Sequence, residues 1–239
     1  MKRFYKEVAL EAQDDGFALN LDGRPVKTPA RRPLILPTRG LAEAVAAEWE
    51  AQGETIDPLS MPLTGLANAA IDHVAADRGR FVSDIMAYAE TDTLCYRAEP
   101  DDPLSARQDA QWEPVLRAVE QHLGIALYRI VGIIHRRQPS NSIERLTAYV
   151  DGRSHFELAG LSSLVGLTGS LVAPLALADG FADADTVWEA VNLEELAQEE
   201  KWGSDAEAVE NRMLRRSAFD AAANFCSLGR AKSAEPRRE

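Results

Sequence analysis

The stretch "NLDGRPVKTP", residues 20–29, contains the turn that decides the fold at the start of the chain. Its Asp22-Gly23 dipeptide is favoured in two-residue type I′ hairpin turns, because both central positions of that turn need a positive φ. Pro25 follows and has no N–H to donate to a β-ladder, which places the second arm at a sheet edge. The stretch therefore predicts an antiparallel hairpin whose second arm is an edge strand.

The residues that flank this turn predict the register of the hairpin. A two-residue turn places Leu19 opposite Val26 and Phe17 opposite Thr28, so the two arms share an apolar face. Period-two alternation or a short apolar run indicates further strands at 3–10 and 33–37. We therefore expect a small antiparallel meander at the start of the chain.

The same stretch also raises the possibility of a phosphate-binding loop, because Gly, Lys and Thr lie close together in it. A P-loop reads G-x-x-x-x-G-K-[ST], and its second Gly lets backbone N–H groups wrap the phosphate. Here Val26 stands where that Gly is needed, and Gly23 lies too close to Lys27. The hairpin explains the stretch better, and we expect no cofactor.

Beyond Thr38 the apolar residues recur with helical spacing. Thr38 can cap a helix in which Leu41, Val45 and Trp49 form one stripe. The same period predicts further helices after Pro62 and at 79–90, 105–123, 142–150, 154–177, 185–201 and 205–227. Residues 91–97 and 125–138 are predicted to be extended.

These elements predict an α+β fold: a small N-terminal domain with antiparallel strands and a few helices, followed by a mainly α-helical domain. The "EPDDP" cluster at 99–103 is a natural boundary. We expect the N-terminal domain at 1–100 and the helical domain at 101–230. The polar residues 231–239 are expected to form a frayed tail.

The composition is that of a globular protein with an acidic surface. The 239 residues are 46% hydrophobic and 27% charged, and the net charge is −12. Residues 179–210 are dense in Asp and Glu, with Lys201 as their single basic residue. Such a surface repels nucleic acid and anionic membranes, and either attracts a basic protein surface or is simply solvated.

The chain shows no sequence motif for catalysis or metal binding. The four histidines, at 73, 122, 135 and 155, are scattered, and no short metal-ligand spacing joins them. The two cysteines, Cys95 and Cys226, form no C-x-x-C pair, which fits a reducing compartment. We expect no catalytic and no metal-binding residues.

Residues 158–178 carry no charge and are long enough to cross a bilayer. However, the segment holds three Gly, three Ser and a Pro, its flanks are acidic, and no aromatic or basic anchors mark its ends. We expect a buried helix or helical hairpin in a protein core. A membrane-associated scaffold is the less favoured alternative.

The segment "VWEAVNLEELAQEEKWG", residues 187–203, has an unusual pattern for a helix. Val187, Trp188 and Val191 occupy one sector, in which Glu194, Glu195 and Gln198 follow one to two turns later. A second apolar stripe begins on the opposite side with Leu193, Leu196 and Ala197. An apolar stripe thus runs into a cluster of carboxylates.

Several interpretations fit this helix. It can pass from one part of the core to another with its glutamates solvated, or it can present carboxylates beside Trp188 and Trp202 to a partner's Arg or Lys. A di-metal site is poor, because the Glu-x-x-His companion is missing. An alternative function is a metal-dependent hydrolase or transferase that uses the carboxylates of residues 189–200.

Several segments resemble one known family, the chaperones that assemble the alpha subunit of ATP synthase. They are "RFYKEV" (3–8), "LDGRPVKTP" (21–29), "MPLTGLANAAID" (61–72), "ETDTLCYR" (90–97) and "LEELAQEEKWG" (193–203). The resemblance extends over nearly the whole chain. Glu90 stands where an Asp is expected, which is a mild departure.

The resemblance implies a non-enzymatic chaperone with two domains. Such a protein binds the free alpha subunit of the catalytic head and prevents its aggregation until it pairs with a beta subunit. The first Glu of the "LEE" motif is important in the family and falls on Glu194. The partner-binding residues expected here are Glu194, Glu195, Gln198, Glu199 and Trp202.

The remaining expectations concern the partners of the protein and its cellular location. We expect the alpha subunit as the partner, no nucleic acid, no stable membrane insertion and a monomer. The N-terminal "MKRFYKEVAL" alternates apolar and charged residues, unlike a signal or transit peptide. A bacterial cytoplasmic location is therefore expected.

Overall fold

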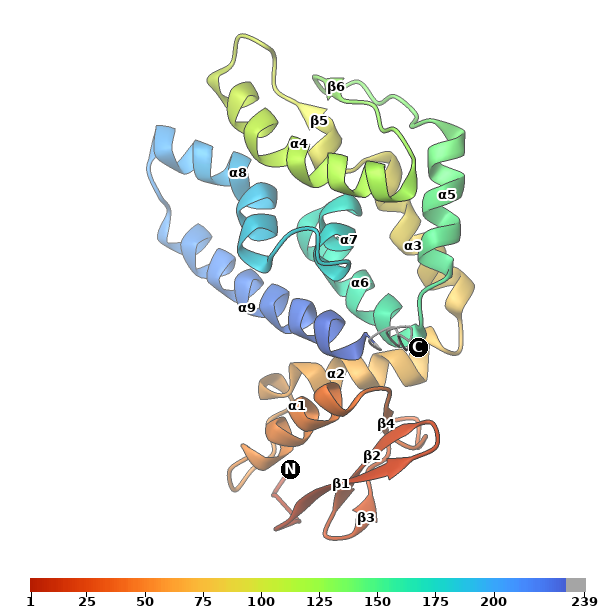
Figure 1. The fold of residues 1–239 in the computed structure, drawn as a ribbon. Coiled ribbons are helices and arrows are strands. Elements are labelled where there is room, and N and C mark those ends of the chain that lie inside the picture. Colours follow the sequence, from red (N-terminus) through yellow and green to blue (C-terminus); the bar gives the residue numbers. More distant parts are fainter. Residues whose placement is uncertain (231–239) are drawn as a thin grey trace, which may run out of the picture. The chain divides into compact units, whose positions relative to one another are not determined.

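A computed structural model describes residues 1–230, so the expected frayed tail at 231–239 lies outside the described residues. Two compact units make up the chain. Among the described residues, the N-terminal unit comprises Met1–Arg78, Ser154–Gly160 and 224–230, and the helical unit comprises Gly79–Arg153 and Leu161–Ala223. Strands and helices together make the α+β fold that the sequence predicts (Figure 1).

The first segment of the N-terminal unit runs to Arg78, and residues 79–100, which the sequence places in the N-terminal domain, are grouped with the helical unit. Asp92 gives the physical reason, because its buried carboxylate accepts hydrogen bonds from Ser170 Oγ at 2.8 Å and from the backbone N–H of Leu171 at 2.7 Å. Thr93 N also donates to Gly169 O at 3.2 Å. The segment after Arg78 is therefore tied to later helices and belongs with them.

An antiparallel sheet forms one layer of the N-terminal unit. Strand β2 (Gly16–Leu21) lies at its centre and pairs with β1 (Val8–Gln13) on one side. On the other side it pairs with the short strands β3 (Arg24–Pro25) and β4 (Ile35–Leu36). The first strand therefore begins later than the expected residue 3.

The hairpin turn at residues 22–23 has the expected geometry. Asp22 and Gly23 both have a positive φ, of 47° and 74°. Val26 N donates to Leu19 O at 2.8 Å, which confirms that pairing. The turn dipeptide therefore sets the local register, as the sequence predicts.

The expected pairing of Phe17 with Thr28 is wrong. Phe17 instead pairs with Leu36 of β4. Thr28 leaves the ladder because its Oγ1 donates to the Asp72 carboxylate at 2.6 Å and its N–H donates to Arg32 O. A carboxylate far along the chain thus ends the hairpin after Val26.

Helices complete the N-terminal unit. Thr38 caps α1 (Arg39–Glu50) by accepting a hydrogen bond from Leu41 N at 3.2 Å, as expected. A 3₁₀ turn (Pro58–Ser60), α2 (Pro62–Ala69) and a π-helical turn (Ala70–Val74) follow. Together, sheet and helices bury Leu19, Leu36, Leu41 and Val45 completely.

The helical unit is built around α4 (Pro103–Leu123), α7 (Val172–Ala178) and α8 (Ala184–Trp202), which pack against one another. The remaining elements are α3 (Arg78–Glu90), a 3₁₀ turn (Thr93–Cys95), β5 (Tyr96–Arg97), β6 (Ile130–Val131), α5 (Ser140–Asp151), α6 (His155–Thr168) and α9 (Ala206–Gly229). Residues 155–160 of α6 and 224–229 of α9 are grouped with the N-terminal unit. Only the pair β5 and β6 is regular strand in the two segments expected to be extended.

The uncharged segment 158–178 is divided between α6 and α7. Gly169, with φ 64°, interrupts it, and Leu158, Leu164 and Leu175 are completely buried. The segment is therefore helical and buried in a protein core, as expected, and consists of two helices. Within residues 1–230, no helix has the length and apolar character needed to cross a membrane.

Candidate partner-binding surface on helices α8 and α9

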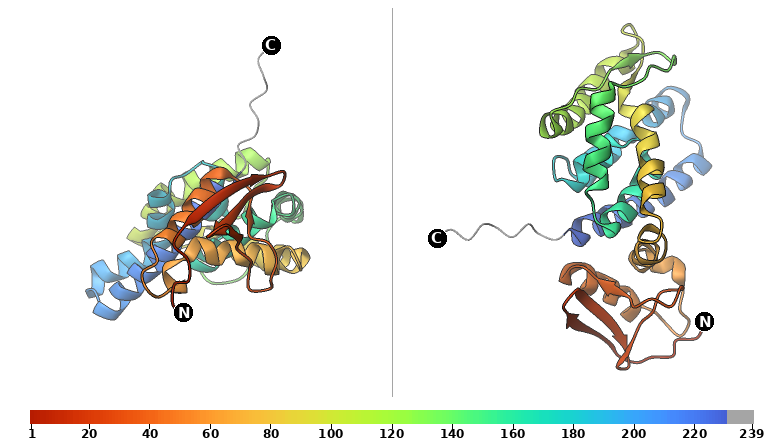
Figure 2. Two further views of the ribbon diagram at one scale, coloured as in Figure 1. Left: turned by 90° about the horizontal axis from the view of Figure 1, so that it is seen from below. Right: turned by 90° about the vertical axis from the view of Figure 1, so that its right-hand side faces the viewer.

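Helix α8 packs against the core of the helical unit. Asp183 caps its start by accepting from Thr186 N at 2.7 Å, and Gly203, with φ 88°, ends it. Trp112 of α4 is buried, and its Nε1 donates to Ala190 O at 2.7 Å. Helix α9 follows after a short turn, and the two helices lie side by side in the views of Figure 1 and Figure 2, joined by ion pairs.

Glu194 is exposed, but a buried side chain holds it. Gln108 Nε2 donates to Glu194 Oε1 at 2.8 Å, and Gln108 Oε1 accepts from Ala98 N at 2.8 Å. Gln108 is completely buried, so its amide has one orientation that satisfies both bonds. The Glu194 carboxylate therefore has a fixed position at the surface. Among residues 1–230, no hydrogen-bond donor contacts its second oxygen, Oε2.

Glu195 and Glu199 are engaged within the molecule. Arg212 of α9 donates to Glu195 at 3.0 Å and to Glu199 at 2.5 and 2.9 Å, and Arg215 also bonds Glu195. The hydrogen bond from Arg212 holds the pKa of Glu199 below its usual value. These two carboxylates join α8 to α9, which the sequence did not predict.

The last turn of α8 combines an ion pair with an exposed ring. Arg107 of α4 donates to Glu200 at 2.7 and 3.1 Å. Gln198 is exposed, and Trp202 is 71% exposed, with the Lys201 ammonium 5.0 Å from its ring centre. Of the five expected partner-binding residues, Glu194, Gln198 and Trp202 are thus accessible.

Two further apolar side chains are exposed on α9. Met213 is 68% and Leu214 is 65% exposed, beside the arginines that bond the α8 glutamates. Large apolar side chains gathered on an exposed surface are typical of binding sites. The sequence indicates that these two side chains are exposed. Met213 and Leu214 stand between arginines, and they lie outside the helical face that contains the buried Phe219.

The carboxylates of α8 give no support to the alternative of a metal-dependent enzyme. Glu195, Glu199 and Glu200 are all bonded to arginines. In the part of the chain that the structure describes, no cluster of three or more His, Cys, Asp or Glu side chains has metal-site geometry. Cys95 and Cys226 are buried thiols, and burial raises the pKa of Cys95.

Gln108, Arg212 and Arg215 were missed by sequence reasoning. Gln108 lies 86 residues before Glu194 in the chain. Nothing in the local pattern of α4 marks a buried glutamine as a hydrogen-bond donor to a distant helix. The arginines of α9 were visible in the sequence, but the side-by-side placement of α8 and α9 was not.

The comparisons with known proteins agree on one family. The family model described as "ATP12 chaperone protein" matches residues 2–120. The mitochondrial protein atp12 of Schizosaccharomyces pombe is 25% identical over 235 residues, which span 92% of this chain and 81% of the relative.

Solved structures match almost the whole chain, including α8 and α9. Atp12 from Paracoccus denitrificans is 37% identical with a TM-score of 0.91, over 96% of this chain and 98% of that one. A putative chaperone from Agrobacterium tumefaciens is 38% identical with a TM-score of 0.89, over 95% and 85%. The chain therefore belongs to the ATP12 chaperone family.

Proposed function

We propose that this protein is a non-enzymatic assembly chaperone that binds the free alpha subunit of the ATP synthase catalytic head. It keeps the subunit soluble until the subunit pairs with beta. Family membership supports the chaperone role. The observation offered for the alpha-subunit contact is a set of exposed side chains on two helices that ion pairs join. They are Glu194, Gln198 and Trp202 of α8 with Met213 and Leu214 of α9, here called the α8–α9 surface.

The composition of the α8–α9 surface suits a client that must be released. A free subunit of a ring exposes apolar interface area, which aggregates unless it is covered. Trp202, Met213 and Leu214 provide apolar cover of limited size, and Glu194 provides a hydrogen-bond acceptor for a basic group. A mixed contact of this kind is selective without the large apolar area of a permanent complex.

Glu195 and Glu199 act indirectly in this proposal. Because Arg212 and Arg215 bond them, they hold α8 and α9 together and keep the exposed residues in one place. Glu194, Gln198 and Trp202 then contact the client. The protein acts as a monomer in the bacterial cytoplasm, without nucleic acid and without membrane insertion.

The experiment is a binding measurement between the purified protein and the alpha subunit of its own organism. Gel filtration is expected to show a complex with free alpha and none with assembled alpha and beta. Trp202→Ser combined with Leu214→Ser removes two exposed apolar contacts, so the complex is expected to weaken while the fold is unchanged. Leu59→Ser is the control, because Leu59 is even more exposed but lies in the N-terminal unit.

Equal complex formation by the double variant and the wild type would contradict the assignment of this surface. Absence of any complex with free alpha would contradict the client itself. Circular dichroism of each variant checks that the helices are retained.

A further inference from the structure

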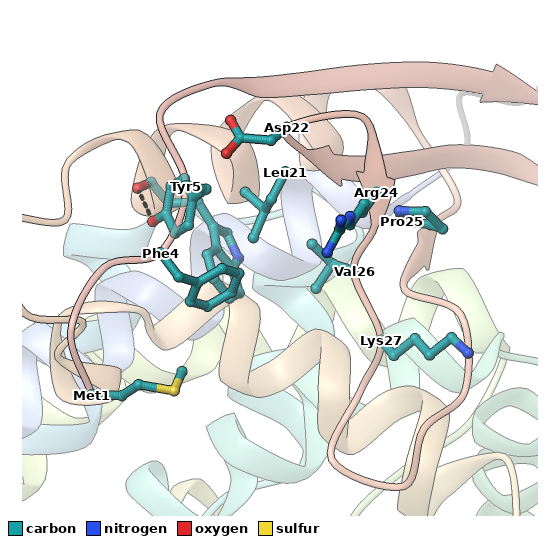
Figure 3. Close-up of a pocket in the computed structure, with 10 residues that line it drawn as sticks. Met1, Phe4, Tyr5, Leu21, Asp22, Arg24, Pro25, Val26 and Lys27 are labelled. Carbon is teal, nitrogen blue, oxygen red and sulfur yellow. Dashed lines mark hydrogen bonds between the residues drawn. The ribbon is translucent and has the colours of Figure 1, made fainter.

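A cavity in the N-terminal unit lies outside the α8–α9 surface and has no role in the proposed function. Its volume is about 590 Å³, within the range of about 300–1,000 Å³ that is usual for ligand sites. Its walls come from the first residues of the chain, from the hairpin at 21–27 and from Trp49 of α1 (Figure 3). All of these residues belong to one unit.

One wall of the cavity is aromatic. The rings of Phe4 and Tyr5 meet edge to face with their centres 5.4 Å apart, and Tyr5 lies 5.7 Å from Trp49. The Tyr5 hydroxyl donates to Trp49 O at 2.6 Å, which fixes the ring against α1. Phe4 is nevertheless 62% exposed, so a large apolar face remains open to an apolar side chain.

The opposite wall carries a cation that is free to bind. Figure 3 shows the Arg24 guanidinium directed into the cavity, beside Val26. No hydrogen bond or ion pair joins Arg24 to another side chain within residues 1–230. The nearby carboxylate of Asp22 accepts from Glu7 N at 2.9 Å and from Lys6 N at 3.0 Å, and these bonds, with a smaller effect of the Arg24 charge, hold its pKa below the usual value. Arg24 therefore has the capacity to take a carboxylate from outside.

One residue of the cavity wall, Trp49, also carries an unmet hydrogen-bond donor. Trp49 Nε1 is buried and has no acceptor among the described residues. Buried donors of this kind are uncommon in folded proteins, because each costs free energy until it is paired.

We propose that this cavity binds a short segment of a partner protein in which an aromatic or aliphatic side chain stands next to carboxylates. The apolar side chain lies against Phe4 and Trp49, and a carboxylate pairs with Arg24. The site is separate from the α8–α9 surface and does not depend on which client that surface takes. It gives the protein a second, sequence-selective contact.

The test uses the indole N–H resonance of Trp49 in the ¹⁵N-labelled full chain, assigned by its loss in Trp49→Phe. The probe is the blocked pentapeptide Gly-Asp-Phe-Glu-Gly, with Gly-Asn-Phe-Gln-Gly and Gly-Asp-Gly-Glu-Gly as matched peptides. The acidic aromatic peptide is expected to shift the resonance saturably. The two matched peptides are expected to bind about tenfold more weakly, because each lacks one of the two interactions.

Variants of the cavity separate its two walls. Arg24→Glu is expected to weaken binding of the acidic peptide about tenfold and to leave binding of the amide peptide unchanged. Phe4→Ala is expected to weaken binding of both peptides that contain Phe. Arg80→Glu, which makes the same charge change at an exposed position of α3, is the control and is expected to bind as the wild type does.

Three results would overturn the proposal. They are no saturable shift with any peptide, equal binding of the acidic and amide peptides, or the same shift with inorganic phosphate or anionic phosphatidylglycerol vesicles in place of peptide. Glu194→Lys is expected to leave peptide binding intact, so failure of this site is distinguishable from failure of the proposed alpha-subunit contact.

Discussion

At the scale of single residues, neighbouring carboxylates on one helix have different roles because their surroundings differ. Glu194 is held by a neutral, buried amide and keeps its charge available at the surface. Glu195, one position later, is paired with two arginines. The "LEE" motif therefore contains one carboxylate that faces outward and one that joins two helices.

Gln108→Leu tests the support of Glu194. The substitution leaves Ala98 N and Glu194 Oε1 without their partner, and a buried unpaired group costs about 1–3 kcal/mol. We expect the free energy of unfolding in urea to fall by an amount in that range. Gln111→Leu is the control on the same helix, because Gln111 Oε1 already lacks a partner, and it is expected to cost less. Equal losses for the two variants would refute the role of Gln108.

At the scale of elements, α8 and α9 act as one unit because ion pairs join them. Arg212 reaches Glu195 and Glu199, and all three side chains are partly buried. Partly buried ion pairs of this kind contribute more to the free energy of unfolding than fully exposed pairs, whose contribution is about 0–1 kcal/mol. The exposed apolar residues of the α8–α9 surface depend on this joint for their relative placement.

Arg212→Met tests the joint between α8 and α9. It leaves Glu199 without a cation and Glu195 with Arg215 alone, so we expect a lower melting temperature and weaker binding of the client. Arg80→Met removes an ion pair that is exposed on both sides and is expected to change the melting temperature little. If Arg212→Met lowered the melting temperature no more than Arg80→Met does, the ion pairs of Arg212 would not be what holds α8 and α9 together.

A second ionic cluster fixes the loop between α4 and α5. Arg129 donates to Glu113 at 2.8 Å and to Glu120 at 2.5 Å. The loop that it anchors exposes Ile133 and Ile134 to 97% and 81%. Hydrogen bonds from Arg129 lower the pKa of Glu113 to about 2.

This shift predicts a pH dependence of stability. Because the pKa of Glu113 is lower in the folded protein than its ordinary value of 4.5, its contribution is complete above about pH 4.5 and disappears as the pH falls toward 2. We expect Glu113→Gln to be less stable than the wild type at pH 7, with a difference that shrinks below pH 4. Denaturant unfolding at several pH values measures it, and a difference that is constant down to pH 2.5 would contradict the assignment.

At the scale of the whole molecule, local patterns were sufficient for some features. The Asp22-Gly23 turn, the Thr38 cap and the helical periods of α4 and α8 depend on neighbouring residues, so the sequence predicts them. The helix pattern and the family resemblance single out Glu194 and Trp202 as partner-binding residues; both are exposed, and their role stays a prediction.

Long-range contacts decided the features that were not predicted. Asp72 draws Thr28 out of the hairpin, and Asp92 joins the segment after Arg78 to residues 170–172. Arg212 neutralises two glutamates that looked free in the sequence. Each contact joins side chains whose proximity exists only in the folded chain, and no local periodicity encodes it.

The alpha-subunit contact is tested most directly by the aggregation of that subunit on dilution from denaturant, followed by light scattering. Wild-type protein is expected to suppress the scattering in proportion to its concentration. Glu194→Lys is expected to lose most of this effect while it remains folded, because it reverses the charge presented to the client. Glu144→Lys, the same change at an exposed position of α5, is expected to protect as the wild type does. Indistinguishable scattering curves for wild type and Glu194→Lys would contradict the account.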